Sequence, residues 1–523
     1  PSQFSITVEA MRLNRLQEGF LNTKRIDYDD IVCLGSFTRM VVNALGETSI
    51  CCTAKIPGMG MGDVYFPAGK ALTPSVFDYY TDILWGMATF DNFYCIYGCG
   101  YLELNDYYDR MNPQFISVLK ELRRKYREGE INSKIEAMIY ILNHFSVQNI
   151  NKREIYIKLF NEMLTYAMQL SNLKDIETKV ISLIRQIPES VLSTKEKMDF
   201  LSLLLSKIPV SPISKADLNF MYPDYAEDIA LAMKEYAERH PEKGSLKFAM
   251  MGAGNGLALF YIRMMNALLV NRPIEYYAYE IDEEMIERCK SINPDVHFIQ
   301  ADFLIPSEIE QPDKFDFIDI TNVIHEIYSF GGYSDSLHTI DRNKGISKVK
   351  AFLESVNRLL SEEGILQISD GFIPQRPEDI VVVKLKTPEA VEAFKRFETE
   401  FILPVNVEWL NEDTISIDRY TLSLFMNKLP LLTIRKWFDM REEFKEVYHY
   451  LSLDHYQQIL YSTGFITDKI LIYQQKTVLE KCFNTQIEIL NGEELPLQRM
   501  KIFAHKGSGE LDIVSPRLIP PVI

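Results

Sequence analysis

The sequence has few of the features that mark membrane proteins and disulfide-bonded or zinc-binding proteins. Only seven of its 523 residues are cysteines, and no two of them form a Cys-x-x-Cys pair, the spacing that many zinc and redox sites use. No apolar run is long enough to span a bilayer, and no segment has the basic start, apolar stretch and cleavage site of a secretory signal. We therefore expect buried thiols, a cytoplasmic location and no membrane partner.

Positive charge is also scarce. Lys and Arg number 56 against 73 Asp and Glu, which gives a net charge of −17. Nucleic acids are bound through a basic field, and the basic stretch Lys120–Arg127 has the pattern of a solvated helix face. A nucleic-acid partner is therefore not expected. The hydrophobic content of 47% and the charged content of 25% are those of a globular chain with room for two or three domains.

Three regions can be distinguished along the chain. Residues 1–111 are mixed in pattern, residues 112–240 carry apolar residues at helical spacing, and residues 241–523 alternate strand-like and helical patterns around an insertion at 372–450. We expect a mostly α-helical N-terminal region, which is a lid, a substrate-binding region or a partner-binding module, followed by an α/β domain. Helices are predicted at 115–122, 135–145, 155–170, 176–187, 195–208 and 224–239.

The most informative segment is a glycine-rich turn between a strand and a helix. The apolar run Leu246–Met251 is typical of a strand buried on both faces, and Leu257–Ile262 begins a helical pattern. Between them stands Gly252-Ala253-Gly254-Asn255-Gly256. Glycines let the backbone approach a ligand, and the helix start offers unpaired N–H groups. The turn therefore predicts a nucleotide-like ligand.

Acidic residues end the two strands that follow. Ile274–Tyr279 predicts a second strand that ends at Glu280, where a carboxylate can accept hydrogen bonds from both ribose hydroxyls. The acids Asp282–Glu284 have an ordinary role at a helix start. Val296–Asp302 predicts a third strand with an acid at its end. That last carboxylate either binds the ligand or caps the next turn.

Together these residues resemble the core of the class I S-adenosylmethionine-dependent methyltransferases. The resemblance implies a Rossmann-like α/β domain with a seven-stranded sheet. A helix at 349–360 and a turn at 361–364 would lie before the fifth strand, and a helix at 456–463 before the sixth. The fourth strand would begin at residue 315 and the fifth would span 365–369. The sixth strand would follow Gly464, and the seventh would span 499–504.

The resemblance also implies the cofactor and its binding residues. In that family the cofactor is S-adenosyl-L-methionine. The glycine turn lies under its methionine part, the acid after the second strand binds the ribose, and the acid after the third binds the adenine amine. The implied cofactor-binding residues are Gly252, Ala253, Gly254, Gly256, Glu280, Ile281, Asp302, Phe303 and Asn322.

One position departs from the family pattern. An acid usually stands two residues before the first glycine and helps to hold the methionine amine, but this position is Met250. Either another group takes that role or the cofactor is held differently. A nicotinamide-binding Rossmann domain is the competing interpretation, but it needs a small residue where Leu257 stands.

Candidate catalytic residues follow the fourth strand. By the resemblance, Thr321–Phe330 lies where the methyl group meets the acceptor. An unperturbed His325 has a pKa of about 6.5 and is predicted to act as a base near neutrality. Glu326 is an alternative base, or it orients the imidazole. The competing interpretation is a packed strand-end His325 and a surface Glu326.

A divalent metal held by His325, Glu326 and Asp370 is an alternative, because Asp370 ends the fifth strand at the same edge. His449 and His455 are weaker candidates. We predict methyl transfer to a small-molecule or peptide acceptor, with no metal assigned and a homodimer as the expected assembly. The alternatives are aminocarboxypropyl transfer from the same cofactor and a non-catalytic cofactor-binding or interaction protein.

Overall fold

In the computed structural model, the strand pair Val41–Val42 and Thr48–Ser49 is described together with eleven further segments. The chain divides into two units, residues 1–208 and 209–523. Apart from that strand pair, the predicted region 1–111 lies outside the described residues, as does most of the predicted helix 115–122. The described segments are 121–122, 124–144, 152–170, 173–208, 223–309, 314–334, 338–434, 440–474, 478–497, 499–508 and 511–518.

The first unit is helical over most of its described residues, as predicted. Ser193 begins the last helix with a capping box: its side chain accepts from the Glu196 N–H, and the Glu196 carboxylate accepts from the Ser193 N–H. Apolar side chains on the helices, Phe200 among them, are buried. The elements are the antiparallel strands β1 (Val41–Val42) and β2 (Thr48–Ser49), the helices α6 (Lys134–His144), α7 (Lys152–Met168), α8 (Leu173–Asp175), α9 (Ile181–Gln186) and α10 (Thr194–Leu205), and the π-helical turn η2 (Ile176–Val180).

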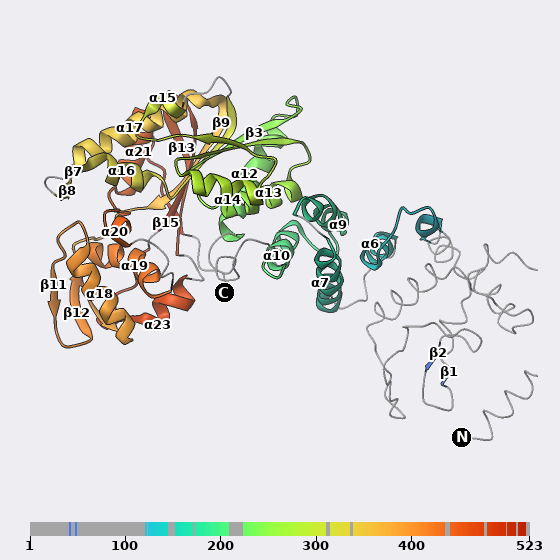
Figure 1. Ribbon diagram of the computed structural model, residues 1–523, viewed down its shortest axis with the longest axis horizontal. Helices are drawn as coiled ribbons and strands as arrows, with labels where there is room; N and C mark the ends of the chain where they lie inside the picture. The colour runs from blue at the N-terminus through green and yellow to red at the C-terminus, as the bar shows by residue number, and fades with distance from the viewer. Residues whose placement is uncertain are drawn as a thin grey trace, which may run out of the picture. The chain divides into compact units, whose positions relative to one another are not determined.

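An eight-stranded sheet forms the centre of the second unit, with the strand order β16-β13-β15-β9-β6-β3-β4-β5. Its strands β3, β9, β13 and β15 are labelled in Figure 1. The five strands from β9 to β5 run parallel, whereas β15 is antiparallel to both β9 and β13. All seven predicted strands are present, and β16 adds a short eighth, so the predicted Rossmann-like α/β fold is confirmed. The strands are β3 (Leu246–Met251), β4 (Ile274–Glu280), β5 (His297–Gln300), β6 (Phe315–Thr321), β9 (Leu360–Gly371), β13 (Phe465–Tyr473), β15 (Arg499–Lys506) and β16 (Arg517–Leu518).

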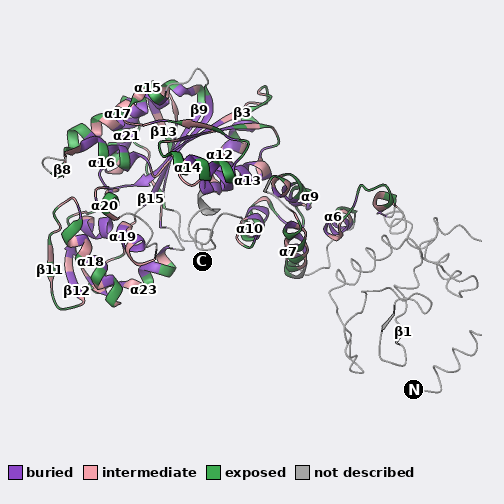
Figure 2. Ribbon diagram, viewed as in Figure 1, coloured by how far each residue is buried: buried purple, intermediate pink, exposed green. Residues whose placement is uncertain are grey.

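Helices cover this sheet, and Figure 2 shows its strands buried between helices with exposed outer surfaces. The predicted helix before the first strand is present as α12 (Pro223–Arg239). It is fastened to β6, because the Tyr236 hydroxyl donates to Asp316 at 2.9 Å, and the same carboxylate also accepts from the N–H of Lys247 on β3 at 2.8 Å. The other helices are α13 (Leu257–Leu269), α14 (Glu283–Ile292), α15 (Pro306–Ile309), α16 (Ile324–Gly332), α17 (Arg342–Leu359) and α21 (Leu453–Ser462).

The start of β9 differs from the prediction of a turn at 361–364. The strand already begins at Leu360, which pairs with Phe315, while the next paired residue is Ile365, opposite Phe317. Residues 361–364 therefore bulge out of the ladder inside the strand. The turn-forming residues are where we predicted them, but the strand continues on both sides of them, because Leu360 is buried against the sheet.

A second lobe, coloured orange to red in Figure 1, is inserted in the chain between strands of the central sheet. Its four-stranded antiparallel sheet has the order β11-β12-β10-β14. Because β14 follows β13, the lobe is built from two chain segments, one after β9 and one between β13 and β15. Its elements are β10 (Ile380–Leu385), β11 (Val407–Trp409), β12 (Thr414–Asp418), β14 (Ile487–Ile489), α18 (Pro388–Glu400), α19 (Arg419–Thr433), α20 (Met440–Glu443), η3 (Leu479–Phe483) and α23 (Asn484–Gln486).

A short hairpin of β7 (Tyr333–Ser334) and β8 (Thr339–Ile340) lies between α16 and α17. Within the described ranges, no helix combines the length and the apolar character that crossing a membrane requires.

Candidate active site

The glycine turn joins β3 to α13 at the carboxyl edge of the sheet. Gly252, Gly254 and Gly256 have φ angles of 77°, 52° and 78°, a region that side chains disfavour. A Cβ atom on Gly252 would lie 2.3 Å from the Val323 side chain, and one on Gly256 would lie 2.4 Å from Cys289 Sγ. A Cβ atom on Gly254 would meet no atom of the described segments within 4 Å. The outer glycines are thus needed for packing, and the middle one borders open space.

The structure brings Glu280 to this turn, at the end of the neighbouring strand. The Gly254 N–H donates to Glu280 Oε2 at 2.8 Å, and the N–H groups of Ile281 and Asp282 donate to Oε1 at 2.9 and 3.1 Å. The side chain of Ile281 beside it is 55% exposed. The carboxylate therefore braces the glycine turn beside Gly254, while its predicted contact with a ribose stays a prediction.

Asp302 and Phe303 follow β5 at the same edge. The Leu304 N–H donates to Asp302 Oδ1 at 2.8 Å, and the Asp302 N–H donates to Glu308 at 2.8 Å. Asp302 thus caps a turn, which was the alternative to ligand binding, although one bond does not occupy all of its acceptor sites. The Phe303 ring lies 3.8 Å from the Cβ position of Gly252, so this aromatic side chain borders the glycine turn.

The position of the missing acid is filled by the buried Met250 side chain. In the register of the sheet, Met250 lies opposite Asp319 of the neighbouring strand β6. Asp319 is fully buried and accepts from Thr321 Oγ1 at 3.1 Å. Ala253 is also buried, and its N–H donates to the Tyr279 carbonyl at 3.0 Å. A carboxylate thus exists one strand away from the usual place, which the sequence alone did not indicate.

Asn322, at the end of β6, has an unusual backbone. Its φ angle is 57°, one of three positive values found for non-glycine residues in the described segments. Its N–H donates to the Ser369 carbonyl at 2.9 Å, and the guanidinium of Arg499 donates to its side-chain oxygen. Backbone strain of this kind persists where neighbouring groups impose it, often at functional sites.

His325 lies in the first turn of α16, not at a strand end, and is fully buried. Its backbone N–H donates to Asp370 Oδ2 at 2.9 Å, and its Nδ1 donates to Asp370 Oδ1 at 2.8 Å. Gly371 N–H also donates to this carboxylate at 2.7 Å. Because Asp370 holds the proton on Nδ1, the lone pair of the neutral imidazole is on Nε2. That atom has no hydrogen-bond partner within the described part of the protein.

The segment after α20 closes over the imidazole. Glu446 Oε2 lies 3.6 Å from His325 Nε2, which is too long for a hydrogen bond. The Tyr448 ring stacks on the imidazole with 3.7 Å between ring centres. The Val447 N–H donates to Ser329 Oγ at 2.9 Å and fastens the segment to α16. The second lobe therefore completes the site that the central sheet begins.

The electrostatics of the cluster differ from the expectation of an ordinary histidine. Burial opposes a charged imidazole, but Asp370 and Glu446 outweigh it and raise the pKa of His325 to about 10. The predicted titration near 6.5 is therefore wrong for this state of the site. Desolvation raises the pKa of Glu326, and Glu446 adds to the effect. The Glu326 side chain remains accessible to solvent, which moderates this shift.

One ligand atom each from His325, Glu326 and Glu446 lies within 4.8 Å of the others. This set differs from the metal alternative considered above, because Asp370 accepts the proton of Nδ1 and Glu446 takes its place in the cluster. A ring nitrogen and two carboxylates are a donor set that a divalent cation accepts. The same three groups can also surround a bound ammonium ion.

His449, near the end of the insertion, and His455, in α21, have other roles. His449 is buried, its Nδ1 donates to the Phe372 carbonyl at 2.6 Å, and its Nε2 contacts the Asn427 amide. Burial lowers the pKa of His449 to about 4, so it is neutral. His455 is exposed and lies 2.9 Å from Ser452 Oγ at the start of α21. Neither belongs to the cluster around His325.

Lys428 on α19 is a site residue that sequence reasoning missed. Its side chain is buried, with Nζ 3.2 Å from Glu443 Oε2 and 4.0 Å from Glu446 Oε2. The same ammonium lies 4.6 Å from the centre of the Tyr448 ring, the ring that stacks on His325. No local motif signals such a residue, because only tertiary packing brings α19 to α16.

No protein-family model and no curated protein matches the chain. Solved structures do match. A methyltransferase from Mesorhizobium loti is 16% identical, over 54% of this chain and 98% of its own, with a TM-score of 0.29. The CurJ carbon methyltransferase is 12% identical (71% and 79% covered, TM-score 0.30), and the plantazolicin methyltransferase BamL is 11% identical (68% and 100% covered, TM-score 0.30).

The fold assignment stands on the sheet itself. Five parallel strands are followed by an antiparallel β15 inserted between β9 and β13, and the glycine turn follows the central strand β3. The second unit therefore has the class I S-adenosylmethionine-dependent methyltransferase fold that the sequence resemblance implied.

Proposed function

We propose that this protein transfers a methyl group from S-adenosyl-L-methionine to a small-molecule or peptide acceptor. The observation that carries the proposal is the contact of Gly254 N–H with the Glu280 carboxylate beside open space. A nucleoside on an open α/β sheet binds at this carboxyl edge. Glycines there let the ligand lie close to the protein backbone, and an acidic side chain accepts hydrogen bonds from the ribose hydroxyls.

The neighbouring side chains suit the rest of the cofactor. The exposed apolar side chain of Ile281 and the ring of Phe303 provide apolar surface for an adenine. Asp302 retains acceptor capacity for its amino group. Asn322 and the glycine turn would face the methionine part, where Met250 offers no charge. We propose these residues, with Ala253 buried beneath them, as the cofactor site.

We further propose His325 and Glu326 as the residues that act on the acceptor. Methyl transfer is an in-line displacement at a sulfonium, so the enzyme must position a nucleophile and remove its proton where necessary. The Nε2 lone pair of neutral His325 is directed to Glu446 and Glu326, with Asp370 behind it. A strongly basic imidazole is suited to deprotonate an acceptor group that has a high pKa.

Product analysis tests this function. The full chain is incubated with S-adenosylmethionine and mixtures of amines, phenols and short peptides, and the cofactor products are separated. S-adenosylhomocysteine is expected. Methylthioadenosine would show aminocarboxypropyl transfer instead, and cofactor binding without either product would support a non-catalytic binding protein. Calorimetry with S-adenosylhomocysteine measures cofactor binding independently of the acceptor.

The remaining expectations concern the whole chain. We propose that residues 1–111 and the helical region 112–240 serve as a lid or as a substrate- or partner-binding region for the catalytic region 241–523, apart from α12, which packs on the catalytic sheet. We also propose that two chains associate, which sedimentation velocity at several protein concentrations tests directly.

A further inference from the structure

The groups around His325 are mainly acidic. The carboxylates of Glu326 and Glu446 lie at its Nε2, and Asp370 lies at its Nδ1. Glu443 lies behind Glu446, and the buried ammonium of Lys428 approaches it more closely (3.2 Å) than it approaches Glu446 (4.0 Å). The wall of the cluster thus carries the exposed carboxylate of Glu326 and the buried carboxylate of Glu446, and Lys428 does not fully neutralise them.

This charge distribution discriminates between classes of methyl acceptor. An oxygen, sulfur or carbon acid becomes an anion when it loses its proton, and carboxylates a few ångströms away raise the energy of that anion. An amine instead enters as a cation and becomes positively charged again as its nitrogen bonds to the methyl carbon. Carboxylates therefore stabilise both the bound ammonium and the transition state of an amine acceptor.

Lys428 shows that this wall accommodates an ammonium ion. Its Nζ is held by the carboxylates of Glu443 and Glu446 and by the face of the Tyr448 ring, at 4.6 Å from the ring centre. These are the contacts that proteins use for ammonium groups. The fixed positive charge of Lys428 repels any cation bound by Glu446, but it repels a divalent cation about twice as strongly as a singly charged ammonium ion.

We propose that the methyl acceptor is a primary or secondary amine, bound as its ammonium form between Glu326 and Glu446. This inference rests on the proposed function and names its substrate class. His325 Nε2 takes one proton from the ammonium nitrogen. The freed lone pair forms a bond to the methyl carbon as the bond from that carbon to sulfur breaks. The products are the methylated ammonium and neutral S-adenosylhomocysteine, and the imidazolium releases its proton to water.

The test compares two probes of the same shape, benzylamine and benzyl alcohol, in titrations of the full chain saturated with S-adenosylhomocysteine. Benzylamine is expected to bind at least about tenfold more tightly, because a single charge-assisted contact has about that effect. Glu326→Gln and Glu446→Gln should each reduce benzylamine affinity by about tenfold and leave benzyl alcohol unchanged. The same titrations without S-adenosylhomocysteine separate amine binding from cofactor binding.

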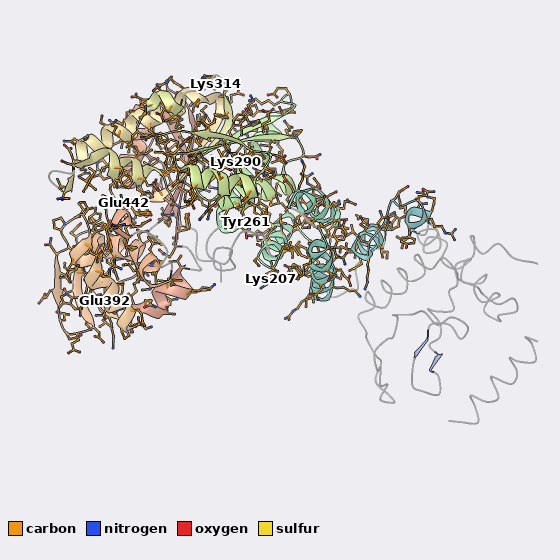
Figure 3. The ribbon with its side chains drawn as sticks, in the orientation of Figure 1. Lys207, Tyr261, Lys290, Lys314, Glu392 and Glu442 are labelled. Atoms are coloured by element: carbon orange, nitrogen blue, oxygen red, sulfur yellow. The ribbon has the colours of Figure 1, made fainter. Side chains whose placement is uncertain are left out.

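The matched control is Glu442→Gln. Glu442 is exposed on α20 (labelled in Figure 3) and pairs with Lys445 at 2.9 Å, so its loss should not change amine affinity. Thermal melting checks the folding of each variant, and the exposed Glu326 carries the test if the buried Glu446 variant is unstable.

Three results would overturn the proposal. The first is equal or absent binding of benzylamine, and the second is a preference that both glutamine substitutions leave intact. The third is tight binding of Mn²⁺ alone that these substitutions abolish, which would assign the cluster to a divalent cation. Loss of S-adenosylhomocysteine binding in the wild type would instead contradict the proposed function.

Discussion

At the scale of single residues, Glu280 carries the cofactor assignment. Glu280→Ala removes the carboxylate that would bind both ribose hydroxyls, so the affinity for S-adenosylhomocysteine should fall by about 1.5–3 kcal/mol. The same carboxylate accepts from the Gly254 N–H, and its loss also loosens the turn. Isothermal titration calorimetry measures the affinity, and melting temperature reports on the fold.

Glu283→Ala is the control for this substitution. Glu283 is exposed in the first turn of α14, three residues further along the chain. We expect no contact between Glu283 and the cofactor, so the Glu283→Ala protein should bind S-adenosylhomocysteine as tightly as the wild type does. A folded Glu280→Ala protein with unchanged affinity would remove the ribose assignment.

The pH dependence is a second residue-scale prediction. His325 is faced by Asp370 on β9, by Glu446 and Tyr448 after α20, by Glu326 on its own helix and by Lys428 on α19. Because the carboxylates raise its pKa to about 10, the neutral base form is scarce at neutral pH. We expect kcat/KM to rise with pH through the alkaline range towards that value, not to level off near pH 6.5.

Asp370→Asn tests the origin of this dependence. The substitution removes a negative charge from Nδ1, so the pKa of His325 should fall and the rising limb should move to lower pH, while kcat also falls because the imidazole loses its orientation. An acceptor amine titrates as well, but its ionisation in free solution does not change with the variant. If kcat/KM of the Asp370→Asn protein rises over the same pH range as that of the wild type, His325 is excluded as the base.

At the scale of elements, two substitutions in the glycine turn distinguish the glycine needed for packing from the glycine proposed to contact the ligand. Gly254→Ala and Gly256→Ala each place an alanine at positive φ, at a cost of about 1–2 kcal/mol. The Cβ atom of the second would also lie 2.4 Å from Cys289 Sγ and 2.8 Å from its Cα. Such overpacking costs about 1–3 kcal/mol more, so Gly256→Ala should be clearly less stable in urea unfolding.

For cofactor affinity we expect Gly254→Ala to be impaired although it is the more stable of the two variants. The Cβ atom of Gly254→Ala enters space that none of the described residues occupies within 4 Å, which is where we place the cofactor. This variant should remain folded and yet bind S-adenosylhomocysteine more weakly. Normal binding by a folded Gly254→Ala protein would show that the ligand does not lie over the middle glycine.

The elements of the sheet could be predicted because each depends on local pattern. Buried runs such as Leu246–Met251 have the composition of strands, and the glycines and Glu280 mark strand ends without reference to the rest of the chain. The bulge at residues 361–364 could not be predicted, because pairing across β6 and β9 sets it. Local sequence predicts where a chain changes direction, but it does not predict whether a strand continues on both sides of that position.

The candidate catalytic cluster around His325 shows the same limit. His325, Glu326 and Asp370 could be found because they follow predicted strands of one sheet edge. Glu446 and Lys428 belong to a lobe whose position against α16 depends on tertiary contacts, such as Val447 N–H to Ser329 Oγ. The raised pKa of His325 follows from Glu446 as well as Asp370, so an unperturbed value was the wrong expectation.

At the scale of the whole molecule, the chain consists of two units, each with its own buried core. In the first unit, residues such as Leu159, Phe200 and Leu204 are fully buried on the helices. In the second, one apolar cluster runs from the central sheet into the second lobe. A cluster shared by sheet and lobe favours their unfolding together, since neither buries its apolar surface alone.

This division leads to a prediction about residues 209–523. Because their apolar core is internal to the unit, a chain of these residues alone should fold with a single cooperative melting transition and bind S-adenosylhomocysteine as tightly as the full chain. Turnover then distinguishes the roles of the N-terminal residues. Loss of methyl transfer with intact cofactor binding is expected of a lid or substrate-binding region, whereas full activity would identify a separate partner-binding module. A folded 209–523 chain that no longer binds the cofactor would contradict both, because it would place part of the cofactor site in residues 1–208.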